Sequence, residues 1–304
     1  MSLLSLLRTP PPPHTFALGD DQLLYGRLSR RRDALAHVEK ATFPAEWFHL
    51  GPVGLLQVDR QALAAALAAV LGRDEKPPSH ASLVIPNSWV RSVVVDVTNL
   101  PRQRQEAEDV VRWRLKKVLP CRPEEVRLDF RVLGDSGRVL ALLALDKPLA
   151  NVEETFAAGG VQLGRIEPAV LAMTTMLPPG NVPALLATVE ERALALALVA
   201  GGSTVVVRHK PLPADARRAE IFVVRELART LAHAREQEKL GERVAVWVAC
   251  ASAEDGAAVE RWAEQEAGVE VHQLAMGPGR VPRLPDVAEM RLWSLLAVAW
   301  DGAA

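Results

Sequence analysis

The chain has 304 residues and a formal net charge of −1 at pH 7. That length can form two domains of ordinary size, and 49% hydrophobic with 24% charged residues is typical of a soluble globular protein. So small a net charge excludes a global field that would attract nucleic acid, and we expect no nucleic-acid partner.

The cysteines and the apolar runs indicate a reducing compartment. Cys121 and Cys250 lie far apart and lack the spacing of metal ligands, so we expect free thiols and no metal site. No stretch reaches the ~20 apolar residues of a membrane span, and the leucines of residues 1–8 follow no basic leader. We therefore expect a cytoplasmic protein.

The first third of the chain predicts a meander followed by a helix. Residues 1–13 are expected to be a tail that ends in a proline-rich spacer. Short strands are predicted at 16–19, 22–29 and 34–40. Asp59 is a good N-cap for an alanine-rich helix that reaches residue 73. Two further strands are predicted at 83–86 and 92–97.

Residues 103–119 form the clearest predicted helix. Its apolar residues recur at helical spacing: Ala107, Val110, Val111, Leu115, Val118 and Leu119. Trp113 lies opposite that stripe, so its indole either packs under a neighbouring subdomain or contacts a partner. Strands at 126–133 and 138–145 are joined by a glycine-containing turn, and helical segments are predicted at 151–159 and 167–176.

The second half repeats the opening pattern. Strands are predicted at 184–189, 192–200 and 203–210, followed by a long helix at 214–238 and a buried strand at 243–250. A helix at 254–267, a strand at 269–274 and a closing helix at 286–300 complete the chain. Two meanders that each lead to a helix, a strand and a helix predict an α/β fold made of two actin-type halves.

The first turn of each meander is where an actin-type fold holds the phosphates of a nucleotide. Here the turns carry Gly19, Asp20 and Asp21 in the first half and Glu190 and Glu191 in the second. A carboxylate ~4 Å from a phosphate repels it by about 4 kcal/mol at an effective dielectric constant of about 20. We therefore expect degenerate phosphate loops and no nucleotide cofactor.

Three stretches of the chain resemble the motifs of a known family. Residues 106–120 (EAEDVVRWRLKKVLP) and 124–133 (EEVRLDFRVL) resemble the pattern IxWE…IPF…EEvvlDyqvl, and residues 159–169 (GGVQLGRIEPA) resemble aGL…iepe…A. Both patterns are those of the PilM family, the cytoplasmic actin-like proteins of type IV pilus assembly. The order of the motifs makes the resemblance, which is shared by the cytoplasmic part of the secretion protein GspL.

The resemblance implies a division of the chain. Its first actin-like (ribonuclease-H-like) half is expected at 14–183, with a small α+β subdomain inserted at 79–146. The second half is expected at 184–304, with the closing helix 286–300 packed back on the first half. Only residues 211–219 separate the second meander from its helix, so the lid subdomain that PilM-type proteins place there is expected to be missing.

The departures from the family concern its nucleotide motifs. Residues 17–23 replace the family's GlDIG loop, and residues 188–191, which include Glu190 and Glu191, replace its second D-x-G loop. Residues 249–252 (ACAS) stand in place of its GG pair. Arg114 stands where the family has Glu, and Cys121 where it has Phe. The altered loops and the missing lid together favour a pseudo-ATPase over an enzyme.

The function implied by the resemblance is protein contact. We expect a cytoplasmic scaffold, peripheral to the inner membrane, in a type IV pilus or related type II secretion assembly platform. It would bind the cytoplasmic N-terminal peptide of a PilN-like membrane protein beside the inserted subdomain, together with other platform proteins. The candidate contact residues are Trp89, Trp113, Leu115, Val118 and Leu119.

Two alternatives stay open. The first is a divergent nucleotide-dependent switch or a sugar-kinase-like enzyme, for which Asp20 is the one plausible catalytic residue. The second is a filament-forming protein, and the missing lid argues against it because actin-type filaments use that subdomain for longitudinal contacts.

Overall fold

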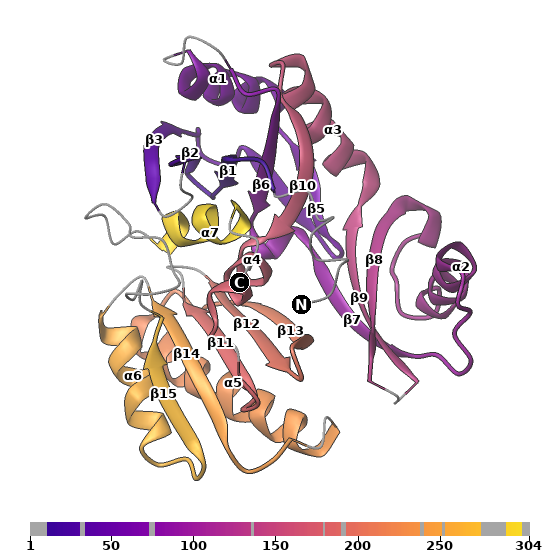
Figure 1. Cartoon of the computed structure of the whole chain (residues 1–304), viewed down its shortest axis with the longest axis vertical. Coiled ribbons are helices and arrows are strands. Elements are labelled where there is room, and N and C mark those ends of the chain that lie inside the picture. Colours follow the sequence, from indigo (N-terminus) through magenta and orange to yellow (C-terminus); the bar gives the residue numbers. More distant parts are fainter. Residues whose placement is uncertain are drawn as a thin grey trace.

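The computed structural model describes residues 11–30, 34–72, 77–134, 137–178, 180–189, 193–237, 240–250, 253–274 and 290–299. Two five-stranded sheets dominate it, one in each half, and a three-stranded sheet projects from the first half (Figure 1). This α/β architecture of two similar halves confirms the fold class predicted from the two meanders.

The first sheet has the strand order β10-β6-β1-β2-β3. Strands β1 to β3 form the predicted antiparallel meander, while β6 runs parallel to β1 and β10 parallel to β6. Helix α1 begins where predicted, because the Asp59 carboxylate accepts hydrogen bonds from the N–H groups of Gln61 and Ala62 at 2.9 and 3.0 Å. The elements are β1 (His14–Leu18), β2 (Gln22–Leu28), β3 (Leu35–Thr42), α1 (Arg60–Leu71), β6 (His80–Ile85), α3 (Asp146–Ala158) and β10 (Gln162–Pro168).

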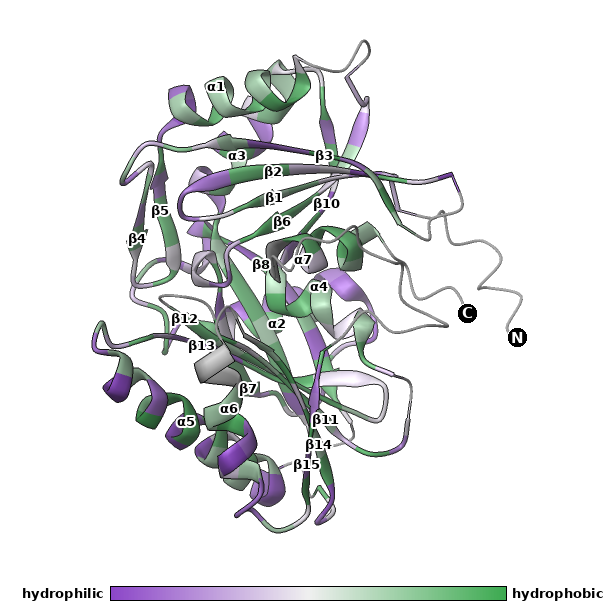
Figure 2. Ribbon diagram, turned by 90° about the vertical axis from the view of Figure 1, so that its left-hand side faces the viewer, coloured by the Kyte–Doolittle hydropathy of each residue, from purple (hydrophilic) through white to green (hydrophobic). Residues whose placement is uncertain are grey.

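The second sheet has the order β13-β12-β11-β14-β15, with α5 and α6 on one side of it (Figure 1). Figure 2 shows that β11, β12 and β14 are hydrophobic along most of their length, whereas α5 alternates hydrophobic and hydrophilic residues. Residues 212–215 alone connect β13 to α5, so no lid subdomain is inserted there. The elements are β11 (Ala184–Val189), β12 (Ala193–Ala200), β13 (Ser203–Pro211), α5 (Ala216–Gln237), β14 (Val244–Cys250), α6 (Ala253–Ala263) and β15 (Val269–Gln273).

The three-stranded sheet lies between β6 and α3 in the sequence and has the order β7-β9-β8. Helix α2 covers one of its faces through Val111 and Leu115, which pack with Val126, Leu128 and Ala141. The elements are β7 (Arg91–Asp96), α2 (Arg104–Leu115), β8 (Val126–Leu133) and β9 (Arg138–Leu145). We call this part the inserted subdomain. A short hairpin, β4 (Phe48–Gly51) and β5 (Gly54–Val58), lies beside it.

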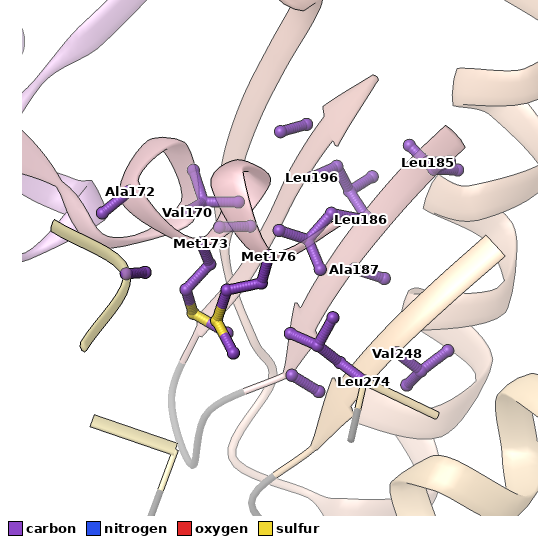
Figure 3. Packing of buried hydrophobic residues seen from close by; sticks show 14 of the residues in the cluster. Val170, Ala172, Met173, Met176, Leu185, Leu186, Ala187, Leu196, Val248 and Leu274 are labelled. Atoms are coloured by element: carbon purple, nitrogen blue, oxygen red, sulfur yellow. The ribbon is translucent and has the colours of Figure 1, made fainter. Parts of the chain in front are cut away.

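The two halves share one hydrophobic cluster. Helix α4 (Ala169–Met173) and the turn after it carry Met173 and Met176, which lie against Leu186 and Ala187 of the second sheet (Figure 3). Helix α7 (Met290–Ala299) contacts α4 and packs on β1, β2 and β6 of the first sheet. Within the described part of the chain, no helix combines the length and apolar character that a membrane span needs.

Several elements differ from the sequence prediction. The helix predicted to reach residue 119 ends at Leu115, after which Val118 and Leu119 donate backbone hydrogen bonds to the Leu115 carbonyl at 2.9 and 3.0 Å. The β4–β5 hairpin was not predicted. Strand β10 was also missed, because a bulge between Leu163 and Arg165 breaks its alternation. The predicted tail residues 1–10, and residues 286–289 and 300 of the closing helix, lie outside the described residues.

Candidate functional site

The turn between β1 and β2 occupies the position of the first phosphate loop. The Gly19 N–H donates to the Gln22 carbonyl at 2.9 Å and closes the hairpin. The Trp47 indole N–H donates to the carbonyls of Gly19 and Asp20 at 3.2 and 3.0 Å. The Asp20 and Asp21 residues are exposed. The backbone groups named here bond within the first half, and the side chains that the turn presents to solvent are carboxylates.

Trp47 is a residue that the sequence reasoning missed. It is buried, stacks on Phe43 with ring centroids 3.9 Å apart, and lies 5.6 Å from the Trp89 ring. The aromatic residues of 43–48 could have indicated such a cluster. Because Trp89 belongs to this cluster and is 1% exposed, it is a core residue and not a surface contact.

The second candidate turn joins β11 to β12. Glu190 and Glu191 lie outside the described residues, as do residues 251–252 after β14. Val189 of β11 pairs with Leu194 of β12, so the two strands form the antiparallel pair predicted from the sequence.

The face of the inserted sheet opposite α2 borders two hollows. Because side chains alternate along a strand, Leu140, Leu142 and Ala144 of β9 share this face. Val94 of β7 lies directly across from Leu140 and shares it too. One hollow lies toward β10 of the first sheet, and the other toward β13 of the second.

The first hollow, which we call the β10 groove, has a volume of about 680 Å³. It lies between the inserted sheet and β10. Among the described residues β10 has one ladder partner, β6, so its other edge is open within that part of the chain. A Cβ added at Gly164 of β10 would meet no atom within 4 Å. The groove has an apolar lining that includes Ile85, Leu142, Leu149, Leu163, Ile166 and Leu171.

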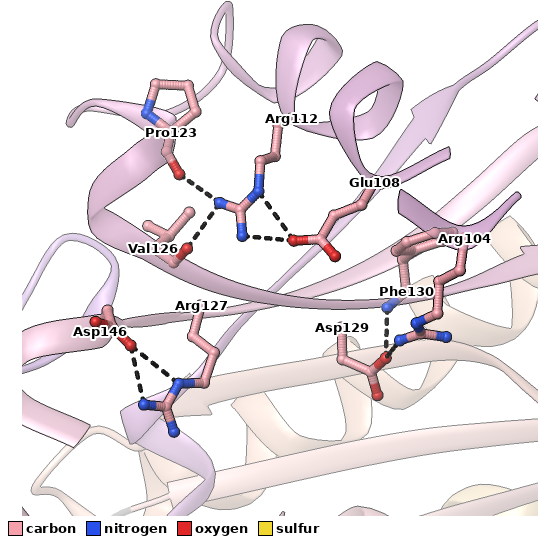
Figure 4. Close-up of polar contacts among 9 residues, drawn as sticks. All are labelled: Arg104, Glu108, Arg112, Pro123, Val126, Arg127, Asp129, Phe130 and Asp146. Carbon is pink, nitrogen blue, oxygen red and sulfur yellow. Dashed lines mark hydrogen bonds and ion pairs between the residues drawn. The ribbon is translucent and has the colours of Figure 1, made fainter. Parts of the chain in front are cut away.

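The charged residues around the β10 groove neutralise one another. The Arg104 guanidinium lies 2.9 Å from the Asp129 carboxylate, and Arg127 lies 2.9 Å from both Asp146 and Glu153. Figure 4 shows the Arg104–Asp129 and Arg127–Asp146 pairs side by side along β8. The groove therefore offers apolar surface and backbone hydrogen-bonding groups with no marked excess of either charge.

Glu167 is the most deeply buried charge of this groove. Burial raises the pKa of its carboxyl, and the Arg165 guanidinium, 2.7 Å away, opposes that rise. The pair lies on β10 itself and fixes the direction of two side chains on the edge strand.

Arg112 joins helix α2 to the start of β8, in addition to the Arg104–Asp129 ion pair. Arg112 donates to the Glu108 carboxylate at 2.7 Å and to the carbonyls of Pro123 and Val126 at 2.7 and 2.8 Å (Figure 4). A guanidinium suits this position because it can donate to several acceptors at once. These bonds hold the helix against the start of β8.

The remaining candidate contact residues separate into buried and exposed ones. Leu115, the last residue of α2, is fully buried, whereas Trp113 and Val118 are 60% and 44% exposed and Leu119 is partly buried. The prediction that Trp113 packs under a neighbouring subdomain is therefore wrong for this chain. Arg114 and Lys117 lie over its ring, 5.1 and 5.9 Å from the centroid.

None of the five candidate contact residues lines the β10 groove. The groove residues Leu142, Leu163 and Ile166 were missed because the groove forms only where β9 and β10 meet in the fold. Leu142 shows this most clearly: it is partly buried but belongs to none of the three hydrophobic clusters.

Comparison by sequence gives no match to a protein-family model, and no curated protein matches significantly. Comparison by structure does. The PilM–PilN type IV pilus biogenesis complex contains a chain that is 17% identical, with a TM-score of 0.72 and coverage of 96% of this chain and 97% of that one.

Two more distant structures agree. One is the cytoplasmic domain of EpsL, an inner-membrane component of the type II secretion system of Vibrio cholerae (12% identity, TM-score 0.53, 95% of both chains). The other is a Bacteroides thetaiotaomicron protein with an actin-like ATPase fold (10% identity, TM-score 0.50, 90% of this chain and 94% of that one). The chain therefore has an actin-like fold of the PilM-like type, as its central motifs predicted.

Proposed function

We propose that the chain is a scaffold of a type IV pilus or related type II secretion assembly platform at the inner membrane. In this proposal it binds the cytoplasmic N-terminal peptide of a PilN-like membrane protein in the β10 groove. It does so without ATP, as a pseudo-ATPase, and reaches the membrane through its partners.

The observation that carries the proposal is the β10 groove itself. An extended peptide can add to an open strand edge through main-chain hydrogen bonds, while its side chains enter pockets beside the strand. Strand β10 has such an edge, and the wall opposite it presents Leu142 and Ala144 beside charges that are paired with one another. The structural similarity to a protein solved with PilN supports the choice of peptide.

The β1–β2 turn supports the absence of a nucleotide. A phosphate site needs backbone N–H groups and small side chains that converge on the anion. The Gly19 N–H is already used by the Gln22 carbonyl, and Asp20 and Asp21 add exposed carboxylates to the same turn. The described residues of this turn therefore do not fit a nucleotide phosphate.

The experiment is isothermal titration with a synthetic N-terminal peptide of a PilN-like membrane protein encoded beside this chain. Leu142→Ser removes apolar groove surface without touching a core cluster, and we expect peptide affinity to fall about tenfold, since about 1.4 kcal/mol of lost burial gives that factor.

The matched control is Val94→Ser. Val94 lies on the same face of the inserted sheet and is 41% exposed, but it borders the other hollow. We expect its peptide affinity to equal that of the unmodified chain. Equal loss in both variants, or none in Leu142→Ser, would place the peptide elsewhere.

A further inference from the structure

The second hollow is a separate site with different chemistry. This β7–β13 cavity has a volume of about 970 Å³ and lies between the edge strand of the inserted sheet and an edge strand of the second sheet. The β4–β5 hairpin and α5 contribute its other walls. It brings together residues from both halves. It adjoins the β10 groove at Val90 and Pro168, which line both hollows, and no residue of the β1–β2 turn lines it.

Strand β13 has a ladder partner on one side only among the described residues, and its other edge borders this cavity. The Ser92 hydroxyl of β7 donates to the Val207 carbonyl of β13 at 2.6 Å, so that carbonyl points away from β12. In an antiparallel ladder, the backbone groups of alternate residues point to the same side. The N–H and C=O groups of His209, two residues on, therefore point the same way, and His209 also lines the cavity.

Positive charge is in excess in the β7–β13 cavity. Four cations line it, as do two carboxylates, those of Glu226 and Glu236. Glu226 is 4% exposed and already bound by Arg229 at 3.0 Å. The lining cations are Arg91, Arg208, Lys210 and Arg229.

Three of these cations, Arg91, Arg208 and Lys210, have no carboxylate partner among the described residues. Arg208 donates to the Thr230 hydroxyl at 3.3 Å, and no described residue places a carboxylate within ion-pair distance of Arg208 or Lys210. Burial lowers the pKa of the Arg208 guanidinium, which nonetheless stays charged at neutral pH. In the β10 groove, by contrast, Arg104 and Arg127 are each paired with a carboxylate.

We propose that the β7–β13 cavity binds an acidic, extended peptide segment of a partner protein. The segment adds to the β13 edge through the backbone of His209, and its carboxylates bind Arg208 and Lys210. A lone small anion would satisfy the cations but would leave both the strand edge and most of the 970 Å³ unused. The inference is independent of the peptide proposed for the β10 groove.

The test is fluorescence polarisation with the full chain and a fluorescein-labelled octapeptide of alternating Val and Glu, beside the same peptide with Lys for Glu. We expect the Glu peptide to bind at least tenfold more tightly. We expect Lys210→Gln, and more strongly Lys210→Gln with Arg208→Gln, to weaken it at least tenfold. Lys116→Gln, the same change at an exposed lysine of the inserted subdomain, should leave it unchanged.

Four results would overturn the proposal. Equal binding of the Glu and Lys peptides would show that the cations do not select an acidic ligand. Unchanged binding by the folded Lys210→Gln variant would show that the peptide does not bind in this cavity. Undiminished binding of a Glu peptide N-methylated at alternate residues would exclude addition to the strand edge. Displacement by the PilN-like peptide would assign both ligands to one groove, whereas full binding by Leu142→Ser would confirm that the two sites are separate.

Discussion

The two buried tryptophans of the first half provide a matched test of how the β1–β2 turn is held. Trp47 and Trp89 are each 1% exposed and lie in the same aromatic cluster. The Trp47 N–H donates to two carbonyls of the turn, whereas the Trp89 N–H has no hydrogen-bond partner among the described residues. Replacement of either by Phe removes the same atoms, so the two variants differ mainly in hydrogen bonding.

The magnitudes follow from that difference. Loss of the Trp47 hydrogen bonds destabilises the fold by about 1 kcal/mol net and leaves carbonyls of the turn without a donor. Loss of the Trp89 N–H has the opposite effect, because it removes a buried donor that has no partner among the described residues and whose burial costs about 1 to 3 kcal/mol. We therefore expect Trp47→Phe to lower the free energy of unfolding by about 2 kcal/mol more than Trp89→Phe does. Urea unfolding followed by far-ultraviolet circular dichroism measures this without relying on tryptophan fluorescence. An equal loss, or a greater loss in Trp89→Phe, would refute the reasoning.

Three other predictions concern the framework of the grooves. Gly54→Ala should lower the free energy of unfolding by about 3 kcal/mol or more, because φ is +118° and the added Cβ would lie 2.1 Å from the Trp89 carbonyl oxygen. Its control is Gly134→Ala, where φ is +52° and the added Cβ would meet no atom within 4 Å. We expect this control to lose about 1 kcal/mol, measured by thermal or urea unfolding. Arg112→Gln should lower the free energy of unfolding by about 2 to 4 kcal/mol, because two carbonyls and a carboxylate lose their hydrogen-bond donor. Hydrogen exchange of the backbone amides of α2 should become faster in this variant. Burial raises the pKa of Glu167 above its ordinary 4.5. The contribution of Glu167 to stability is therefore greatest at low pH and is lost as the pH rises through the raised pKa. Urea unfolding at several pH values should show that Glu167→Gln becomes more stable relative to the unmodified chain over that pH range. Similar costs at both glycines, unchanged exchange in α2, or a stability difference independent of pH would each contradict the corresponding statement.

Local patterns in the sequence were sufficient for the repeated architecture. The two meanders appear as alternating apolar runs between polar turns, and Asp59 identifies the start of α1 to the residue. Strands β8 and β9 lie at the predicted residues because the turn between them is glycine-rich. These features depend on neighbours in the sequence.

The grooves could not be predicted in the same way. The β10 groove brings Leu142 and Ile166 together, and the β7–β13 cavity brings Ser92 and Val207 together. Both sites therefore depend on how strands that are distant in the sequence pack in the fold. Trp113 shows the complementary difficulty. Its position opposite the apolar stripe of α2 was clear, but only the packing of the whole subdomain decides that its indole is exposed.

The most direct test of the proposed scaffold is titration of the PilN-like peptide into the chain, with and without ATP and Mg²⁺. A scaffold without a nucleotide site predicts one-to-one peptide binding with the same Kd in both conditions and no heat from ATP alone, because a ligand that does not bind cannot shift the affinity of another. Micromolar ATP binding, or a peptide Kd that changes with ATP, would show instead that the chain is a nucleotide-dependent switch.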